Sequence, residues 1–79
     1  MSSDKKTELQ ALKIVALAFI NMADTYAAEL KSLNVQLDTA KTDAEIAYIG
    51  VKVAVVMVKV EQLKIDMNAN SKEIDLLVA

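Results

Sequence analysis

Two close pairs of carboxylates have the residue types and spacing best suited to chemistry in this chain. Asp43 stands two residues before Glu45, and Glu73 stands two residues before Asp75. Neighbouring carboxylates can act as general acid and base, or bind a cation. Residues two apart point to different sides of a helix, however, and acids near a helix start stabilise its positive end. We therefore interpret both pairs as helix-start signals, and we predict neither catalytic residues nor metal ligands.

The residue types that are missing limit the chemistry further. The chain has no His, Cys, Trp, Pro or Arg, and Gly50 is its one glycine. Without imidazole or thiolate, zinc fingers, Fe–S sites and disulfides are excluded, and the serines have no histidine to activate them. Gly50 has no phosphate-binding loop around it, so we interpret it as a close helix contact. We expect a protein that is not an enzyme, with no cofactor and no small-molecule substrate.

The charges argue against nucleic acid as a partner. Nine lysines are spread among eleven acidic residues, which leaves a net charge of −2 in 79 residues. Binding to phosphates needs clustered positive charge, and reading of bases favours Arg. Apolar residues make up 54% of the chain, which is too many for intrinsic disorder.

Apolar residues recur at alternating steps of three and four along two long segments. In the first segment they are Leu9, Leu12, Ala16, Phe19, Ala23, Tyr26, Leu30, Leu33 and Leu37. In the second they are Ile46, Ile49, Val53, Val56, Val60, Leu63 and Met67, followed at the same spacing by Asn70, Ile74 and Leu77. This spacing is typical of coiled-coil seams. We expect the two series to form one intramolecular seam.

The fold that we predict is all-α: a single domain, residues 1–79, forming a long antiparallel helical hairpin. The sequence Thr-Asp-Ala-Glu at 42–45 matches a capping box, and Ser3–Asp4 is a candidate cap for the first helix. We expect helices over about 4–37 and 43–67, joined by a turn over about 38–42. Two alternatives remain beyond residue 67. The helix either continues with Asn70 in its seam, or restarts over 71–78 after a cap.

Each helix carries more apolar surface than one seam needs. Residues 14–23 contain one polar residue, and a second apolar line runs along the second helix from Tyr48 to Ile65. A helix that is apolar nearly all round is buried in protein or lipid. A lone hairpin cannot bury both faces, so we predict an interaction face. Its residues are Val15, Ala18, Met22, Tyr48, Val51, Val55 and Val58.

The function that we expect is a structural, assembly or protein-interaction role through helix packing. The partner is a second copy, giving a helical bundle, or a helix of another protein. One alternative is a small regulator that blocks or recruits a single target. Another is a membrane-active or pore-forming protein, in which Lys52 and Lys59 line a pore or snorkel. The mainly apolar stretch 14–23, between Lys13 and Asp24, is shorter than the roughly 20 residues of a membrane span. We therefore expect a cytoplasmic location, with membrane association as the alternative.

Overall fold

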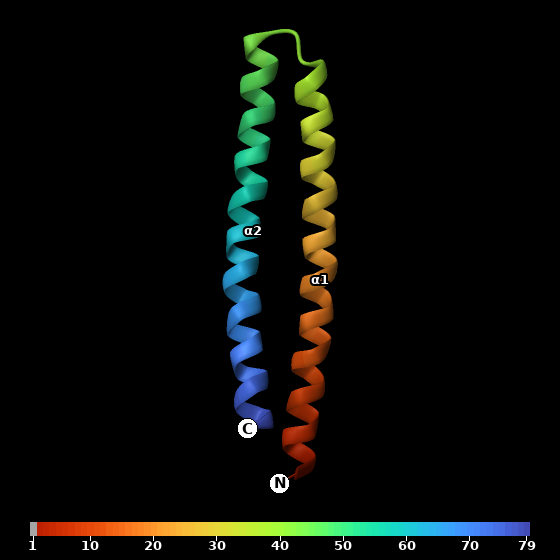
Figure 1. Ribbon diagram of the computed structural model, residues 1–79, viewed down its shortest axis with the longest axis vertical. Helices are drawn as coiled ribbons and strands as arrows, with labels where there is room; N and C mark the ends of the chain where they lie inside the picture. Colours follow the sequence, from red (N-terminus) through yellow and green to blue (C-terminus); the bar gives the residue numbers. More distant parts are fainter. Residues whose placement is uncertain (1) are drawn as a thin grey trace.

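A computed structural model describes residues 2–79, with side chains from Asp4 onward. It contains two helices, α1 (Ser2–Thr39) and α2 (Asp43–Val78), and no strand within the described residues. The helices run antiparallel and side by side along their whole length, with the link at one end and both chain ends at the other (Figure 1). The molecule is a rod of 62 × 15 × 14 Å. The predicted all-α helical hairpin is confirmed.

Both helices are long because the sequence contains little that breaks a helix. There is no proline, and no described residue other than glycine has a positive φ. Proline costs about 3 kcal/mol in a helix interior and glycine about 1 kcal/mol, relative to alanine. α1 begins at Ser2, two residues before the expected start, so Ser3 lies within its first turn instead of preceding the helix. It ends at Thr39, two residues later than expected.

The link between the helices is short because the start of α2 is capped. Thr42 has an extended backbone (φ −122°, ψ 154°), and its Oγ1 accepts a hydrogen bond of 3.1 Å from the Glu45 backbone N–H. Glu45 Oε2 in turn accepts a bond of 3.0 Å from the backbone N–H of Lys41. In the usual capping box the acid binds the N–H of the cap residue itself. Here it binds one residue earlier, which also ties down the link.

α2 continues without a break beyond residue 67, where the sequence allowed either a continuous helix or a new cap. Asn70 is buried within this helix, and its Nδ2 donates a hydrogen bond of 3.1 Å to the backbone carbonyl of Leu12. The helix ends at Val78, so the second helix is longer than the range 43–67, and no new cap forms near residue 70. A polar residue inside a seam fixes the register of two helices, because its partner lies at one level only. The bond from Asn70 to Leu12 marks that level.

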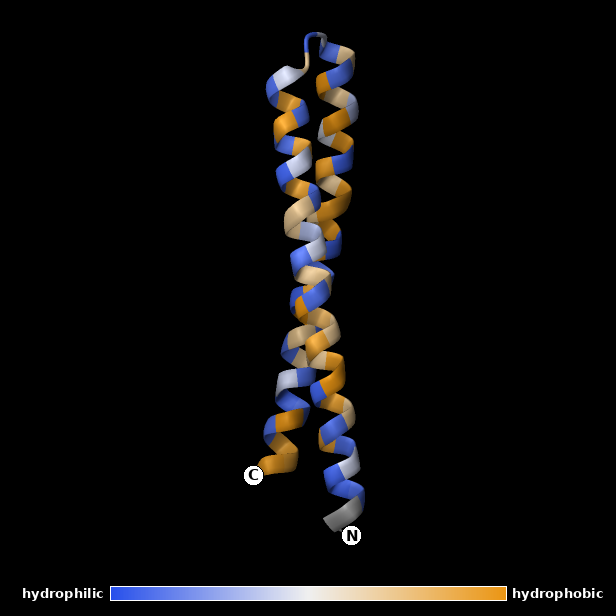
Figure 2. Cartoon of the chain, turned by 90° about the vertical axis from the view of Figure 1, so that its right-hand side faces the viewer, coloured by the Kyte–Doolittle hydropathy of each residue, from blue (hydrophilic) through white to orange (hydrophobic). Residues whose placement is uncertain are grey.

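The interior of the rod is narrow. The buried apolar side chains are Leu33, Ile49, Val56 and Leu63, with exposed fractions of 4–8%. Within the described part of the chain, no large side chain falls below 2% exposure. Two helices enclose only the strip between them, so apolar residues at other positions on each helix remain on the surface. Figure 2 shows hydrophobic residues recurring around both helices, also away from the neighbouring helix.

Candidate interaction surface

The residues of the expected intramolecular seam lie on the facing sides of the two helices. All nine residues of the series on α1 are buried or half-buried, and Leu33 is the most buried of them. On α2 the series alternates between buried and half-buried side chains from Ile49 to Leu63. Ile46 and Met67 are exceptions, with exposed fractions of 46% and 36%. Ile46 lies in the first turn of α2, at the end of the rod.

The residues of the predicted interaction face all lie on the surface. Those on α2 are the more open, with exposed fractions of 64% for Tyr48 and Val51 and 69% for Val58. Val15 and Met22 on α1 lie near 40%. The structure therefore provides solvent-accessible apolar side chains at these positions, while the seam alone holds the two helices together.

Further exposed apolar residues enlarge this surface beyond the seven residues that the sequence predicts. They are Ile14, Leu17, Ile20, Val35, Met57, Ile65, Leu76 and Val78. Four of them, Ile14, Leu17, Ile20 and Met57, lie in the segments 14–23 and 46–60, whose apolar composition is visible in the sequence. Leu76 and Val78 were missed because the continuation of α2 beyond residue 67 was left open.

The apolar surfaces of α1 and α2 are offset along the rod. The bond between Asn70 and Leu12 sets the register, so segment 14–23 of α1 lies beside the part of α2 that follows residue 58. The apolar segment 46–60 of α2 lies beside the later part of α1, where Glu29 and Gln36 are exposed. The hairpin therefore shows one apolar region on α2 nearer the link, and another on α1 nearer the chain ends.

Where α2 is most apolar, an open groove runs beside it along α1. Val51 and Val55 line the groove from α2, together with Lys52, and Glu29 and Ser32 line it from α1. Lys52 Nζ lies 4.4 Å from the centroid of the Tyr48 ring. A cation over an aromatic face is attracted by the ring, at exposed sites by about 0.5–1 kcal/mol. The groove thus combines apolar side chains of α2 with one charged residue from each helix.

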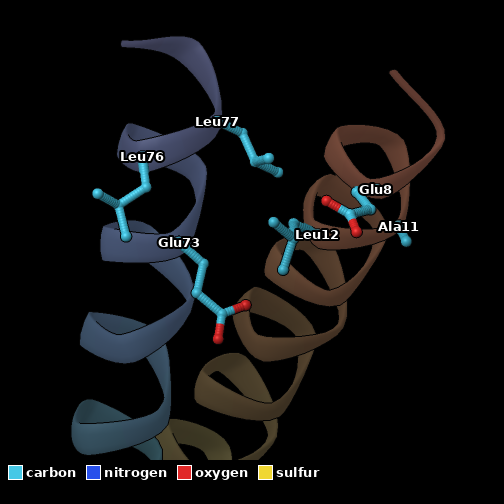
Figure 3. Close-up of a pocket in the computed structure, with 6 residues that line it drawn as sticks. All are labelled: Glu8, Ala11, Leu12, Glu73, Leu76 and Leu77. Atoms are coloured by element: carbon cyan, nitrogen blue, oxygen red, sulfur yellow. The ribbon is translucent and has the colours of Figure 1, made fainter. Parts of the chain in front are cut away.

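A second groove opens near the chain ends (Figure 3). Leu12 and Leu77 point into the space between the helices, and Glu8 and Glu73 extend beside them, one from each helix. Leu76 points away from α1. Among the residues described, no three His, Cys, Asp or Glu side chains gather in a way that could hold a metal ion. The chemistry of this groove is that of an apolar strip edged by negative charge.

α1 has a further property that concerns lipid. By length and composition it is long and apolar enough to cross a membrane, with a stretch of mean hydropathy 1.3 within Asp4–Thr39. None of that stretch is buried within the hairpin. The segment 14–23 is too short to cross a membrane by itself, but apolar residues before Lys13 and after Asp24 extend it.

Comparison with protein-family models, with curated proteins and with solved structures found no match. The class of protein is therefore defined by its own architecture: a long two-helix hairpin with an apolar outer surface.

Proposed function

We propose that this chain is a structural, assembly or protein-interaction module that associates with further copies of itself through its outer apolar surface. The observation that carries the proposal is the exposure of the second stripe on α2, from Tyr48 to Val58, in a hairpin whose seam is already formed by other residues. Burying one exposed Val or Leu side chain contributes about 1.5–3 kcal/mol. A stripe of several such residues supports stable association after the entropic cost of binding.

The chemistry of the chain supports this role over catalysis. Its carboxylates are spread along the surface, and Glu45 is engaged in the cap of α2. No histidine or cysteine is available as a base or nucleophile. What the rod presents in quantity is apolar helix surface, and the function that such a surface serves is packing against another helix.

The mass of the protein in solution tests the proposed self-association directly. Light scattering after size exclusion, without detergent, should give a defined multiple of the 8.6 kDa chain mass. Val55→Glu combined with Val58→Glu should shift that mass to the monomer while circular dichroism remains helical, because each glutamate would have to be buried in the contact. Asn68→Glu combined with Ser71→Glu is the matched control, since both residues are exposed and neither belongs to the apolar surface. It adds the same charge to α2 on another side of the helix, and it should leave the mass unchanged. A monomeric wild type would refute self-association.

Membrane association is a second candidate function, supported by the length and apolar composition of α1. Here the exposed segment 14–23 and its flanks enter lipid instead of meeting protein. Flotation with liposomes of mixed neutral and anionic lipids separates the two proposals. A self-associating rod stays with the soluble fraction, whereas a protein that inserts α1 rises with the vesicles. If α1 inserts into lipid, Ile14→Glu combined with Ile20→Glu should abolish flotation with the vesicles.

A further inference from the structure

The outer stripe of α2 also indicates how two copies pack. We propose that α2 packs antiparallel against α2 of a second copy, with Lys52 facing Glu73 of that copy and Lys59 facing its Asp66. This inference rests on the self-association proposed above and adds the helix that makes the contact, its direction and its register. It therefore specifies both the kind of partner and the charged residues that recognise it.

The stripe is long enough for a contact between two helices. Its exposed side chains are Tyr48, Val51, Val55, Val58, Ile65 and Leu76. They follow the alternating three–four spacing of a coiled-coil seam, with Gln62, Ala69 and Lys72 at the remaining positions. The stripe extends to Leu76 because α2 runs unbroken to Val78. It therefore spans most of the helix, on a side that does not face α1.

A line of charged residues runs beside the stripe. Glu45, Lys52, Lys59, Asp66 and Glu73 follow one another at intervals of seven residues. Residues seven apart lie on one line along a helix, so these five form a single edge of the stripe. The two lysines occupy the part nearer the link, and two of the acids occupy the part nearer the chain ends. Along this edge the charge thus changes sign near the middle of α2.

That order of charges complements itself in an antiparallel pair. Lys59 and Asp66 lie at equal distances on either side of the midpoint between Gln62 and Leu63. Lys52 and Glu73 share the same midpoint. A two-fold axis there brings each lysine opposite an acid of the second copy, which gives four complementary pairs in all. In a parallel pair, Lys52 would lie at the level of Lys52 of the second copy but on the opposite flank of the contact, so no lysine of this edge would meet an acid of the same edge.

The same axis also matches apolar residues. Val58 faces Ile65 of the second copy, Tyr48 faces Leu76, and Val55 faces the small Ala69. Gln62 lies next to its own equivalent at the axis, where two amides can bond to each other. The ammonium of Lys52 already lies over Tyr48. Lys52 is therefore held at the edge of the stripe where Glu73 of the second copy arrives, one helical turn from the place where Leu76 of that copy meets Tyr48.

None of the charges of this edge forms an ion pair inside the described part of the hairpin, although Lys52 shares a groove with Glu29 of α1. Between residues 4 and 79 the one ion pair joins Lys64 and Glu61, at 3.3 Å. Asp66 accepts a hydrogen bond from the neutral amide of Gln62, at 3.0 Å. Pairs of opposite charge at the edge of a helix contact add little affinity but select direction and register. These residues are therefore available to select an antiparallel partner.

Charge reversal tests the pairing. One variant carries Lys52→Glu with Lys59→Glu, and the other carries Asp66→Lys with Glu73→Lys. Each alone should dimerise at least tenfold more weakly than wild type, because all four pairs become repulsive. A one-to-one mixture should recover the complex, since every contact between the two variants is then complementary. The control pair, Lys13→Glu with Lys31→Glu and Asp24→Lys with Asp38→Lys, makes the same charge changes on α1 and should dimerise alone as wild type does.

Cysteine cross-linking tests the direction independently, since the chain contains no cysteine. Gln62→Cys lies at the axis and should form a disulfide between two copies. Val55→Cys alone should not, because antiparallel packing holds the two equivalents far beyond the roughly 7 Å limit between Cα atoms. Efficient linking through Val55→Cys, or unaltered association of both charge variants, would overturn the antiparallel pairing and leave self-association standing. A monomeric wild type would instead refute the proposed function.

Discussion

The two halves of the rod are held together in different ways. Near the link, Leu33, Ile49 and Val56 form an apolar cluster with half-buried neighbours such as Tyr26 and Leu30. Near the chain ends, the interior contains the buried Asn70, and an open groove lies between Leu12 and Leu77 (Figure 3).

This difference shows a division between strength and specificity along one continuous seam. Apolar clusters supply most of the free energy of packing, but they accept neighbouring registers with similar energies. A buried amide contributes less, yet it is satisfied at one level only. The half near the link therefore carries most of the stability, and the bond from Asn70 to Leu12 carries much of the register.

The largest effect on stability should come from shortening a side chain in the apolar cluster near the link. Leu33→Ala should lower the free energy of unfolding by about 3 kcal/mol, because it leaves a cavity at the most buried position of α1. Leu77→Ala, on the half-buried side of the open groove, should cost about 1 kcal/mol. Urea titration at one fixed protein concentration measures both. Equal losses would contradict the proposed difference between the halves.

A smaller effect of opposite sign is expected at Asn70. Asn70→Leu should raise the free energy of unfolding by about 1 kcal/mol, because a buried amide is replaced by an apolar side chain. Amide NMR spectra should at the same time become heterogeneous near Leu12, since the register is no longer fixed. Asn68→Leu, an exposed change on the same helix, is the control and should do neither. A single sharp set of peaks in Asn70→Leu would show that the apolar residues alone define the register.

The cap of α2 should contribute about as much as one hydrogen bond. Thr42→Ala should destabilise the hairpin by about 1 kcal/mol, because the Glu45 backbone N–H loses its acceptor. Thr25→Ala is the control, since the Thr25 hydroxyl only bonds back to a carbonyl that lies within α1. The difference in thermal midpoint between these two variants measures the cap. If both shift equally, the cap adds nothing to the link.

The smallest effect should occur at the glycine. Gly50→Ala should stabilise the hairpin by about 0.7 kcal/mol, because alanine has the higher helix propensity. A Cβ at this position meets no atom within 4 Å. The interpretation of Gly50 as a close helix contact is thus wrong for the hairpin itself. Loss of stability in Gly50→Ala at concentrations where copies associate would indicate that another copy approaches there.

The fold was predictable because its main determinants are local and periodic. The three–four spacing, the absence of proline and the Thr42–Glu45 box together predict two helices and a short link. The course of α2 beyond residue 67 could not be decided, because Asn70 fits both a cap and a seam. The decisive fact is the carbonyl of Leu12 opposite it, and that depends on the register between helices.

The candidate surface was predictable only in part. Spacing identifies Val51, Val55 and Val58 as a line away from the seam, and the structure leaves all three exposed. What covers them stays a prediction, because a periodic pattern describes one helix and not its neighbours. The charged edge from Glu45 to Glu73 could not be recognised from the sequence, because its residues lie on one line only if α2 is a single helix as far as Glu73.

The hairpin shape also determines how the molecule resists force. Both ends of the described chain lie at the same end of the rod (Figure 1). Tension applied between them loads the interhelical contacts one after another, and the bond from Asn70 to Leu12 is reached before the cluster near the link. Tension applied along the rod, from the link to one end, is instead carried by the backbone of a single helix and does not open the seam. A rod of this construction peels apart under a weak pull at its open end and withstands a much stronger pull along its length.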